Sequence, residues 1–293
     1  MKIIVSLGLV MALLIVAQNA TANGGTSVDR AMELLNQARA ALGGEAAIKG
    51  VQSLSIAGKL RRVTDNQDQS GEIKLDILLP DKLKKTETVN LIAGIELTLV
   101  TTLNGDQAWK DSKSSSPGNA QVTIMRPGGQ GQQPVAAQEV RAELARHLLA
   151  LLLTPPSSFP MEYSYAGDAE APDGKADVVD AKGPAGFAAR LFLDKKTHRP
   201  LMLSYRGLVG RVSTMRASGD RSDIDKLVKE AQANAVKQEA EIQLHFSDYR
   251  VVDGILLPHH MTRAANGKIS EEWEITKFKI NPQGLRADRF QKP

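Results

Sequence analysis

The sequence contains no cysteine, and only 4% of its 293 residues are aromatic. Without cysteine the chain cannot form a disulfide, cannot be acylated at a lipobox and has no thiol nucleophile. The formal net charge is +4, and the basic residues are interspersed with acidic ones along the chain. A nucleic-acid-binding surface needs a clustered basic face. We therefore expect no nucleic-acid partner, and we expect the core alone to hold the fold together.

Motifs that would indicate an enzyme are also missing. The five histidines show no metal-ligand spacing such as H-E-x-x-H, and no G-x-S-x-G motif occurs. His259 and His260 are adjacent in an expected strand, so their side chains point to opposite faces. Glu143 and His147 are four residues apart, a spacing typical of a contact on a helix surface. The sequence predicts no catalytic residue, no metal site and no cofactor.

Residues 1–22 have the pattern of a cleaved signal peptide. Lys2 supplies a positive charge, residues 3–17 are almost continuously apolar, and Ala20-Thr21-Ala22 is a small-residue cleavage site. The alternative is a membrane anchor, but this apolar run is short for a spanning helix. We expect the mature chain, residues 23–293, to be a soluble single domain outside the cytoplasm.

Helical and then strand periodicity follow in the mature chain. Ser27 is expected to cap a helix that stops at Gly43-Gly44. From Val51 onward apolar residues alternate with polar ones, which predicts strands over much of the region to residue 109 and again from 162 to 205. Residues 240–293 predict a meander of three strands, because Asp-Gly and Asn-Gly turns separate its alternating runs.

Three segments depart from the strand pattern. Residues 113–133 are rich in Ser, Pro, Gly and Gln, which predicts a flexible loop. Residues 134–153 predict a helix that is apolar all round at its end, so it is buried on more than one side or lies across an oily opening. Residues 219–240 predict an amphipathic helical insertion that caps the sheet or, alternatively, binds a membrane surface.

Together these elements predict a mainly β fold of the α+β class. Its sheet would have about 10 or 11 antiparallel strands, a number large enough for exposed edges to become a liability. Curling the sheet into an open half-barrel and covering its concave face with helices solves this problem.

Several short motifs, in order, give a resemblance to the outer-membrane lipoprotein-sorting, or periplasmic lipoprotein-carrier (LolA-like), superfamily. It covers most of residues 27–293 and rests on the signal peptide, the N-terminal helix and four further segments. These segments are a strand ending in Leu79-Pro80-Asp81, the turn from Asn104 to Trp109, the hairpin from Leu191 to Arg199, and a last strand from Phe278 to Pro282 followed by Phe290 to Pro293.

This resemblance implies a periplasmic half-barrel with a hydrophobic cavity. We expect the lipid-binding lining to comprise Ile73, Leu75, Ile77, Leu79, Leu97, Leu99 and Trp109, with Leu148, Leu151 and Leu152 from the lid helix. The alternative is that the same residues fill a closed core. The best-known members have an Arg immediately before the strand-end Pro, where this chain has Leu79. We therefore do not expect this chain to release its cargo by the mechanism of those members.

The implied function is that of a carrier, which moves lipid or the acyl chains of lipoproteins toward the outer membrane. Its partners would be lipid or acylated protein cargo, an inner-membrane exporter and an outer-membrane acceptor, and we expect a monomer. The alternative is a non-catalytic envelope sensor or scaffold that uses the same fold to bind a protein partner.

Overall fold

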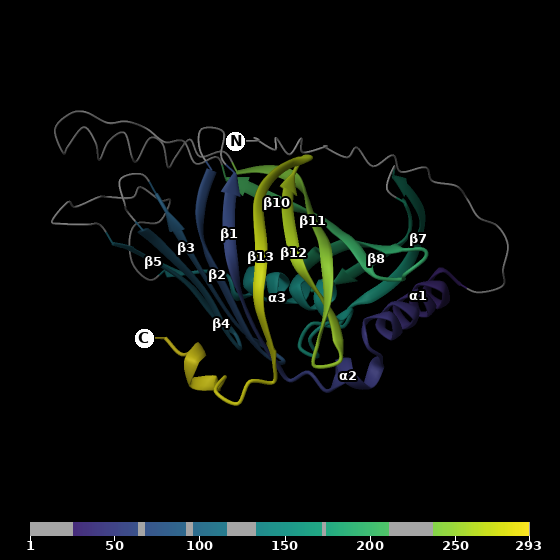
Figure 1. The fold of residues 1–293 in the computed structure, drawn as a ribbon, viewed down its shortest axis with the longest axis horizontal. Helices are drawn as coiled ribbons and strands as arrows, with labels where there is room; N and C mark the ends of the chain where they lie inside the picture. Colours follow the sequence, from purple (N-terminus) through teal and green to yellow (C-terminus); the bar gives the residue numbers. More distant parts are fainter. Residues whose placement is uncertain are drawn as a thin grey trace, which may run out of the picture.

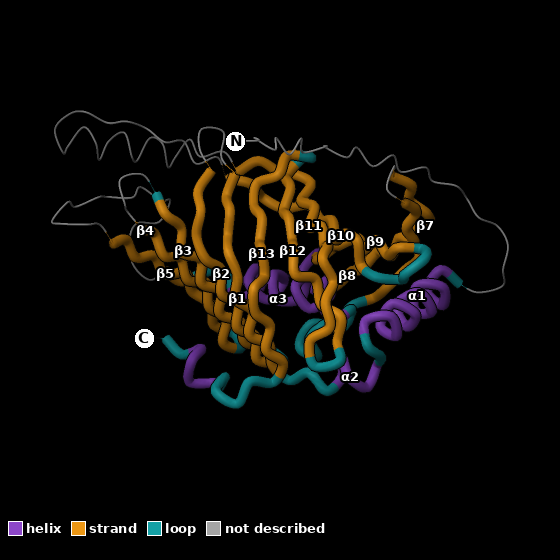
Figure 2. Tube along the Cα trace, in the orientation of Figure 1, coloured by secondary structure: helices purple, strands orange, loops and turns teal. Residues whose placement is uncertain are grey.

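A computed structural model describes residues 26–63, 68–91, 96–115, 133–171, 174–210 and 237–292. These residues form one antiparallel sheet with helices packed against it (Figure 1, Figure 2). The α-helices are α1 (Ser27–Leu42), α2 (Glu45–Lys49) and α3 (Ala137–Leu152), and two short 3-10 helices span Pro184–Gly186 and Ala287–Phe290. The strands are β1 (Ser53–Val63), β2 (Asp68–Leu78), β3 (Lys82–Asn90), β4 (Glu96–Asn104), β5 (Gln107–Ser115), β6 (Gln133–Pro134), β7 (Glu162–Ala171), β8 (Gly174–Gly183), β9 (Phe187–Asp194), β10 (Pro200–Gly210), β11 (Lys237–Val252), β12 (Ile255–Ala265) and β13 (Lys268–Ile280).

The described sheet has 13 strands in the order β6-β5-β4-β3-β2-β1-β13-β12-β11-β10-β9-β8-β7. Every pair but one joins strands that follow each other in the chain. The exception is β1 with β13, where Leu54 lies opposite Ile280. Strands β6 and β7 form the two edges and do not pair with each other in the described residues, so the sheet stays open. This confirms the predicted unclosed antiparallel sheet, although it has 13 strands and not the predicted 10 or 11, and one of the additional strands is the two-residue β6.

Helix α3 connects the two edges of the sheet. Since β6 precedes it and β7 follows it, the chain has to cross the sheet between them. The helix packs against β3, β4, β5, β9 and β10, and Figure 1 shows it in the hollow behind β1, β13 and β12. Its apolar stripe is buried and includes Val140, Leu144, Leu148 and Leu151. The predicted helix is confirmed and lies on the concave face of the sheet.

Helix α1 packs mainly against β7 and also against β12. Its N-cap is Thr26, not Ser27 as predicted. The Thr26 hydroxyl accepts a hydrogen bond from the Asp29 backbone N–H at 3.2 Å, and the Asp29 carboxylate accepts one from the Thr26 backbone N–H at 2.9 Å. This reciprocal pair is a capping box, which Ser27 could not form with the acidic residue at this position. The predicted end of the helix at Gly43 is confirmed, with φ at 131°.

The predicted C-terminal meander is confirmed, with turns at Asp253-Gly254 and Asn266-Gly267. All four of these residues have positive φ, as required for a two-residue turn that matches the strand twist. Two boundaries are corrected. Residues 237–240 belong to β11 and not to the predicted helix of residues 219–240. At the ends of the loop predicted for residues 113–133, residues 113–115 belong to β5 and residue 133 to β6. The rest of the predicted helix, residues 219–236, lies outside the described residues. So do the signal peptide and residues 116–132 of the predicted loop.

Candidate ligand-binding cavity

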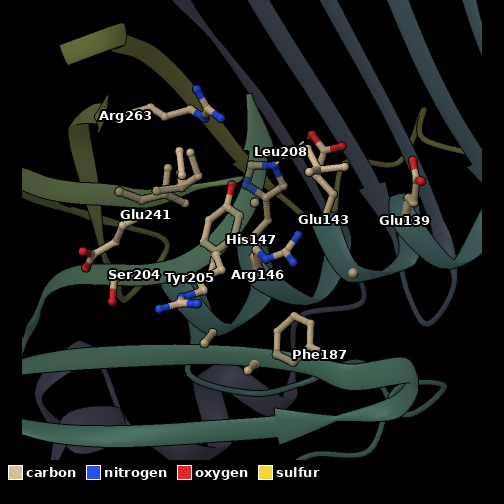
Figure 3. A pocket seen from close by; sticks show the side chains of 18 of the residues that line it. Glu139, Glu143, Arg146, His147, Phe187, Ser204, Tyr205, Leu208, Glu241 and Arg263 are labelled. Carbon is tan, nitrogen blue, oxygen red and sulfur yellow. Dashed lines mark ion pairs between the residues drawn. The ribbon is translucent and has the colours of Figure 1, made fainter. Parts of the chain in front are cut away.

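A large cavity lies on the concave face between α3 and the strands that follow it. Its volume is about 1620 Å³. Side chains from α3 line one wall, and β8 to β13 supply most of the rest, as the close view in Figure 3 shows in part. The helix positions this wall because its apolar stripe is held in the core, which turns the stripe of Glu139, Glu143, Arg146 and His147 toward the hollow.

The lining of the cavity is amphipathic. Its apolar and aromatic side chains come mainly from β9 to β13 and are Phe187, Tyr205, Leu208, Ile242, Leu244, Met261 and Trp273. The same lining contains eight Lys or Arg residues and seven Asp or Glu residues. The cavity is therefore not the purely apolar container that the sequence predicts. The cavity offers apolar surface for the alkyl chain of a ligand and charged groups for its polar end.

A chain of ion pairs links α3 to the sheet. The Lys85 ammonium on β3 lies 2.6 Å from the Glu143 carboxylate. On β1, the Arg62 guanidinium lies 2.7 Å from Glu87 and 3.5 Å from Glu271. Because Lys85 also lies 3.8 Å from Glu87, these five groups form one chain of ion pairs from α3 to β13. We call these five residues the charge network; it fixes the helix over the sheet.

The environment of this network shifts its pKa values. Burial disfavours the charge of Lys85, but the carboxylates of Glu143, Glu87 and Glu271 outweigh it and raise the pKa of Lys85. Burial also disfavours the Glu143 carboxylate, but Lys85 first and then His147 outweigh it and hold the pKa of Glu143 well below its usual range. Both groups are therefore charged at neutral pH.

His147 completes the contact between α3 and β13. Its ring stacks on the Trp273 indole with centroids 5.9 Å apart, and its Nε2 lies 3.8 Å from the Glu143 carboxylate. The Trp273 indole N–H donates a hydrogen bond to Glu271. The predicted Glu143–His147 pair thus lines the cavity and is part of a larger polar assembly, whereas the sequence indicated a helix-surface contact.

Arg146 differs from the other charged residues of α3. Its guanidinium carbon lies 4.0 Å from the centroid of the Tyr205 ring and 5.2 Å from that of Phe187. Its Nε is buried without a hydrogen-bond partner, and burial lowers the pKa of Arg146. Figure 3 shows this side chain projecting from α3 beside Tyr205 and Phe187. The sequence did not predict a role for Arg146, because the spacing of Glu143 and His147 indicated only a surface contact. The charged stripe that these two residues form with Arg146 at helical spacing was the available signal.

The predicted lipid-binding residues occupy a different place. Nine of the ten are buried, with relative exposures of 8% or less, and Leu79 is partly buried against the core. None of the ten is among the lining residues of the cavity. Helix α3 packs against β4 and β5, the strands of Leu97, Leu99 and Trp109. The structure therefore places them in the hydrophobic core, as in the alternative stated for them, and lipid binding by these residues stays a prediction. They are Ile73, Leu75, Ile77, Leu79, Leu97, Leu99, Trp109, Leu148, Leu151 and Leu152.

The described residues contain no group of three or more His, Cys, Asp or Glu side chains that could hold a metal ion. One hydrogen-bonded chain resembles a catalytic arrangement: His260 Nδ1 lies 2.9 Å from the Ser247 hydroxyl, and its Nε2 lies 2.7 Å from the Glu272 carboxylate. The chain joins neighbouring side chains of β11, β12 and β13, and none of its members lines the cavity. We interpret it as a cross-strand polar contact. As predicted, His259 points the other way and is buried.

No protein-family model and no curated protein match the chain. Among the described helices, none is both long and apolar enough to cross a membrane.

Solved structures share the arrangement at low identity. A domain from Vibrio parahaemolyticus assigned to outer membrane lipoprotein sorting is 11% identical over 90% of this chain and 97% of its own, with a TM-score of 0.47. A LolA superfamily protein from Nitrosomonas europaea is 9% identical over 89% and 97%, with a TM-score of 0.48. A DUF1329 family protein from Desulfovibrio piger is 11% identical over 91% and 98%, also with a TM-score of 0.48. The first two names agree with the predicted resemblance to a divergent LolA-like chain. At these identities and TM-scores, what this chain binds has to be argued from its own cavity.

Proposed function

We propose that the protein is a non-catalytic carrier in the periplasm, which holds lipid or the acyl chain of a lipoprotein in this cavity. The observation that carries the proposal is the cavity itself. An open sheet and a crossing helix leave a space of about 1620 Å³, larger than the roughly 300–1,000 Å³ of a typical small-molecule pocket. Its apolar residues lie together on β10 to β13, next to an exposed Leu208.

A carrier is needed because an acyl chain does not cross water unaided. A chain of roughly 15 methylene groups, at about 0.8 kcal/mol each, prefers an apolar phase by on the order of 12 kcal/mol. A soluble protein that covers the chain removes most of this cost. Such a container needs apolar surface and an opening and no catalytic group, in keeping with the cavity described here.

The bound chain is proposed to lie against the exposed Leu208 and the partly exposed Leu244, because Ile242 and Met261 have relative exposures of only 0% and 6%. In this conformation the residues that the sequence predicts as lining are buried in the core, so a chain would reach Leu75 or Leu97 only if the core opened. The cavity residues are therefore the first to test.

Native mass spectrometry of the mature protein, purified from the periplasm of a diderm host, tests the proposal. We expect adducts that organic extraction identifies as phospholipid or acylated peptide. Leu208→Arg, which places a charge in the cavity at a side chain already 57% exposed, should reduce their occupancy. Val251→Arg is the matched control, because Val251 is an exposed apolar residue on β11 outside the lining.

An apo mass for the wild-type protein, with no uptake of added phospholipid or of a fluorescent fatty acid, would overturn the proposal. The alternative function, a scaffold or sensor that binds a protein partner, would then be preferred.

A further inference from the structure

Arg146 is a cation inside the cavity without a counter-ion among the described residues. Among the described residues, no carboxylate lies within 4.0 Å of its guanidinium, and its Nε is buried without a hydrogen-bond partner. Of the other arginines in the lining, Arg62 is paired with Glu87 and Arg190 with Asp180, both at 2.7 Å. Arg206 is exposed to solvent, and Arg263 donates a hydrogen bond to the Ser270 hydroxyl at 3.0 Å. Withdrawing a charge from water without pairing it is costly. Arg146 is therefore the cavity cation most in need of an anion.

The carboxylate nearest to it in sequence is already occupied. Glu143 lies one turn earlier on the same stripe, but its oxygen is 2.6 Å from the Lys85 ammonium. The other acidic members of the charge network, Glu87 and Glu271, are held by Arg62. A ligand anion would thus not have to displace a protein carboxylate from Arg146.

The two aromatic rings fix the position of the guanidinium. Tyr205 lies 4.0 Å from its central carbon and Phe187 lies 5.2 Å from it. Contact with aromatic faces stabilises the cation while its N–H groups stay free to donate at the edge of its plane. A guanidinium held in this way suits a carboxylate or phosphate group, which it binds through two parallel hydrogen bonds.

The apolar side of the cavity lies within the same lining. Tyr205 is on β10, and its strand continues through Gly207 to Leu208, while β11 beside it contributes Ile242 and Leu244. In the register of the two strands, Tyr205 lies directly opposite Ile242. A ligand bound to Arg146 by its polar end would therefore have its alkyl chain next to these residues.

We propose that Arg146 binds the oxyanion, carboxylate or phosphate, at the end of an amphiphile whose alkyl chain occupies the cavity. This inference rests on the proposed carrier function and narrows its ligands to those with an anionic end. Phe187 and Tyr205 hold the guanidinium in place, and neutral lipids of equal chain length bind more weakly.

Calorimetric titration of the delipidated mature protein tests the inference. The probes are palmitate, dodecyl phosphate and methyl palmitate, with acetate and inorganic phosphate as anions that lack the chain. We expect the wild-type protein to bind palmitate and dodecyl phosphate about tenfold to a hundredfold more tightly than methyl palmitate. Acetate and inorganic phosphate should bind far more weakly than either anionic amphiphile.

Two substitutions at Arg146 and one control localise the effect. Arg146→Gln should remove the preference for the acids over the ester and leave ester binding unchanged. Arg146→Lys should keep part of the preference for the acids, because lysine retains the positive charge but cannot donate two parallel hydrogen bonds to one anion. The matched control is Arg141→Gln, which removes a charge from the same helix at a residue that contacts Asp106 and lies outside the cavity lining.

Equal affinities of the wild-type protein for palmitate and for its methyl ester would overturn this inference but not the carrier function. This outcome can be measured with the wild-type protein alone. If Arg146→Gln still preferred the acids over the ester as strongly as the wild-type protein does, Arg146 would not be the residue that binds the anionic group. Binding of free phosphate as tight as that of dodecyl phosphate would replace the amphiphile with a free anion. Failure of every long-chain probe to bind would overturn the carrier function and this inference with it.

Discussion

The Lys85 ammonium on β3 lies 2.6 Å from the Glu143 carboxylate on α3. This ion pair joins the helix that crosses the concave face to the strands beneath it, and it begins the chain of charges that runs through Glu87 and Arg62 to Glu271. The apolar stripe of α3 buries the helix in the core, while this network determines which side of it faces the cavity.

Replacing Glu143 with Gln should destabilise the protein. The side chain of Lys85 is only 17% exposed, so it would keep a largely buried charge with a weaker partner. We expect a loss of about 1 to 3 kcal/mol in the free energy of unfolding, measured by urea denaturation at pH 7. Glu139→Gln, on the same helix but exposed, should change it by less than about 0.5 kcal/mol. Equal effects of the two substitutions would contradict the role of the network.

The same pair predicts a dependence on acid. The folded-state pKa of Glu143 lies below its unfolded value, so its contribution is complete above the unfolded pKa of about 4.5 and is lost as pH falls through the folded pKa. The stability difference between wild type and Glu143→Gln should therefore shrink as the pH is lowered from 7 to 3. A difference that stayed constant over this range, measured by urea denaturation at each pH, would show that Glu143 is not held ionised by the fold.

Substitutions at Leu75 and Leu208 should have different effects, because one residue lies in the core and the other lines the cavity. Leu75 has no exposed surface, whereas Leu208 lines the cavity and is 57% exposed. Leu75→Ala should cost about 2 to 5 kcal/mol of stability. Leu208→Ala should cost little stability but weaken the binding of a fluorescent fatty acid. The reverse pattern in thermal unfolding and probe titration would mean that the residues predicted from the sequence form the binding surface after all.

Gly71 on β2 should not tolerate a side chain. A Cβ atom there would collide with the backbone carbonyl oxygen of Thr88 on β3, so the strands would have to separate. We expect Gly71→Ala to lower the free energy of unfolding by about 1 to 3 kcal/mol. Gly284→Ala is the control, since nothing lies within 4 Å of a Cβ at that position. Similar stabilities for the two variants would argue against the pairing of β2 with β3 described here.

Local signals in the sequence were sufficient for much of the fold. The turns at Asp253-Gly254 and Asn266-Gly267 were predictable because each depends on two residues that accept positive φ. The N-cap was misplaced by one residue, since choosing Thr26 over Ser27 requires the reciprocal bonds with Asp29. Helix α2 and strand β6 were missed because five residues and two residues are too few to show a period.

The site was harder to predict because it depends on contacts between distant segments. The apolar stripe of α3 indicates that the helix is buried, but not which strands it covers. It packs on β3, β4 and β5, and β4 contains Leu97 and Leu99, while the space remains beside the helix, over β8 to β13. Because Glu143 pairs with Lys85, Arg146 has no carboxylate partner among the described residues. This arrangement depends on the three-dimensional fold and is not visible in the spacing of residues along the chain.

The location of the bound chain is the central claim, and photo-crosslinking tests it most directly. The delipidated protein is incubated with a fatty acid that carries a diazirine near its chain end, irradiated and digested, and the labelled peptides are identified by mass spectrometry. We predict labelling of the β10 and β11 residues around Leu208 and Leu244, reduced by excess palmitate and by Leu208→Arg. Labelling that excess palmitate does not reduce, or that falls outside the cavity lining, would contradict the account.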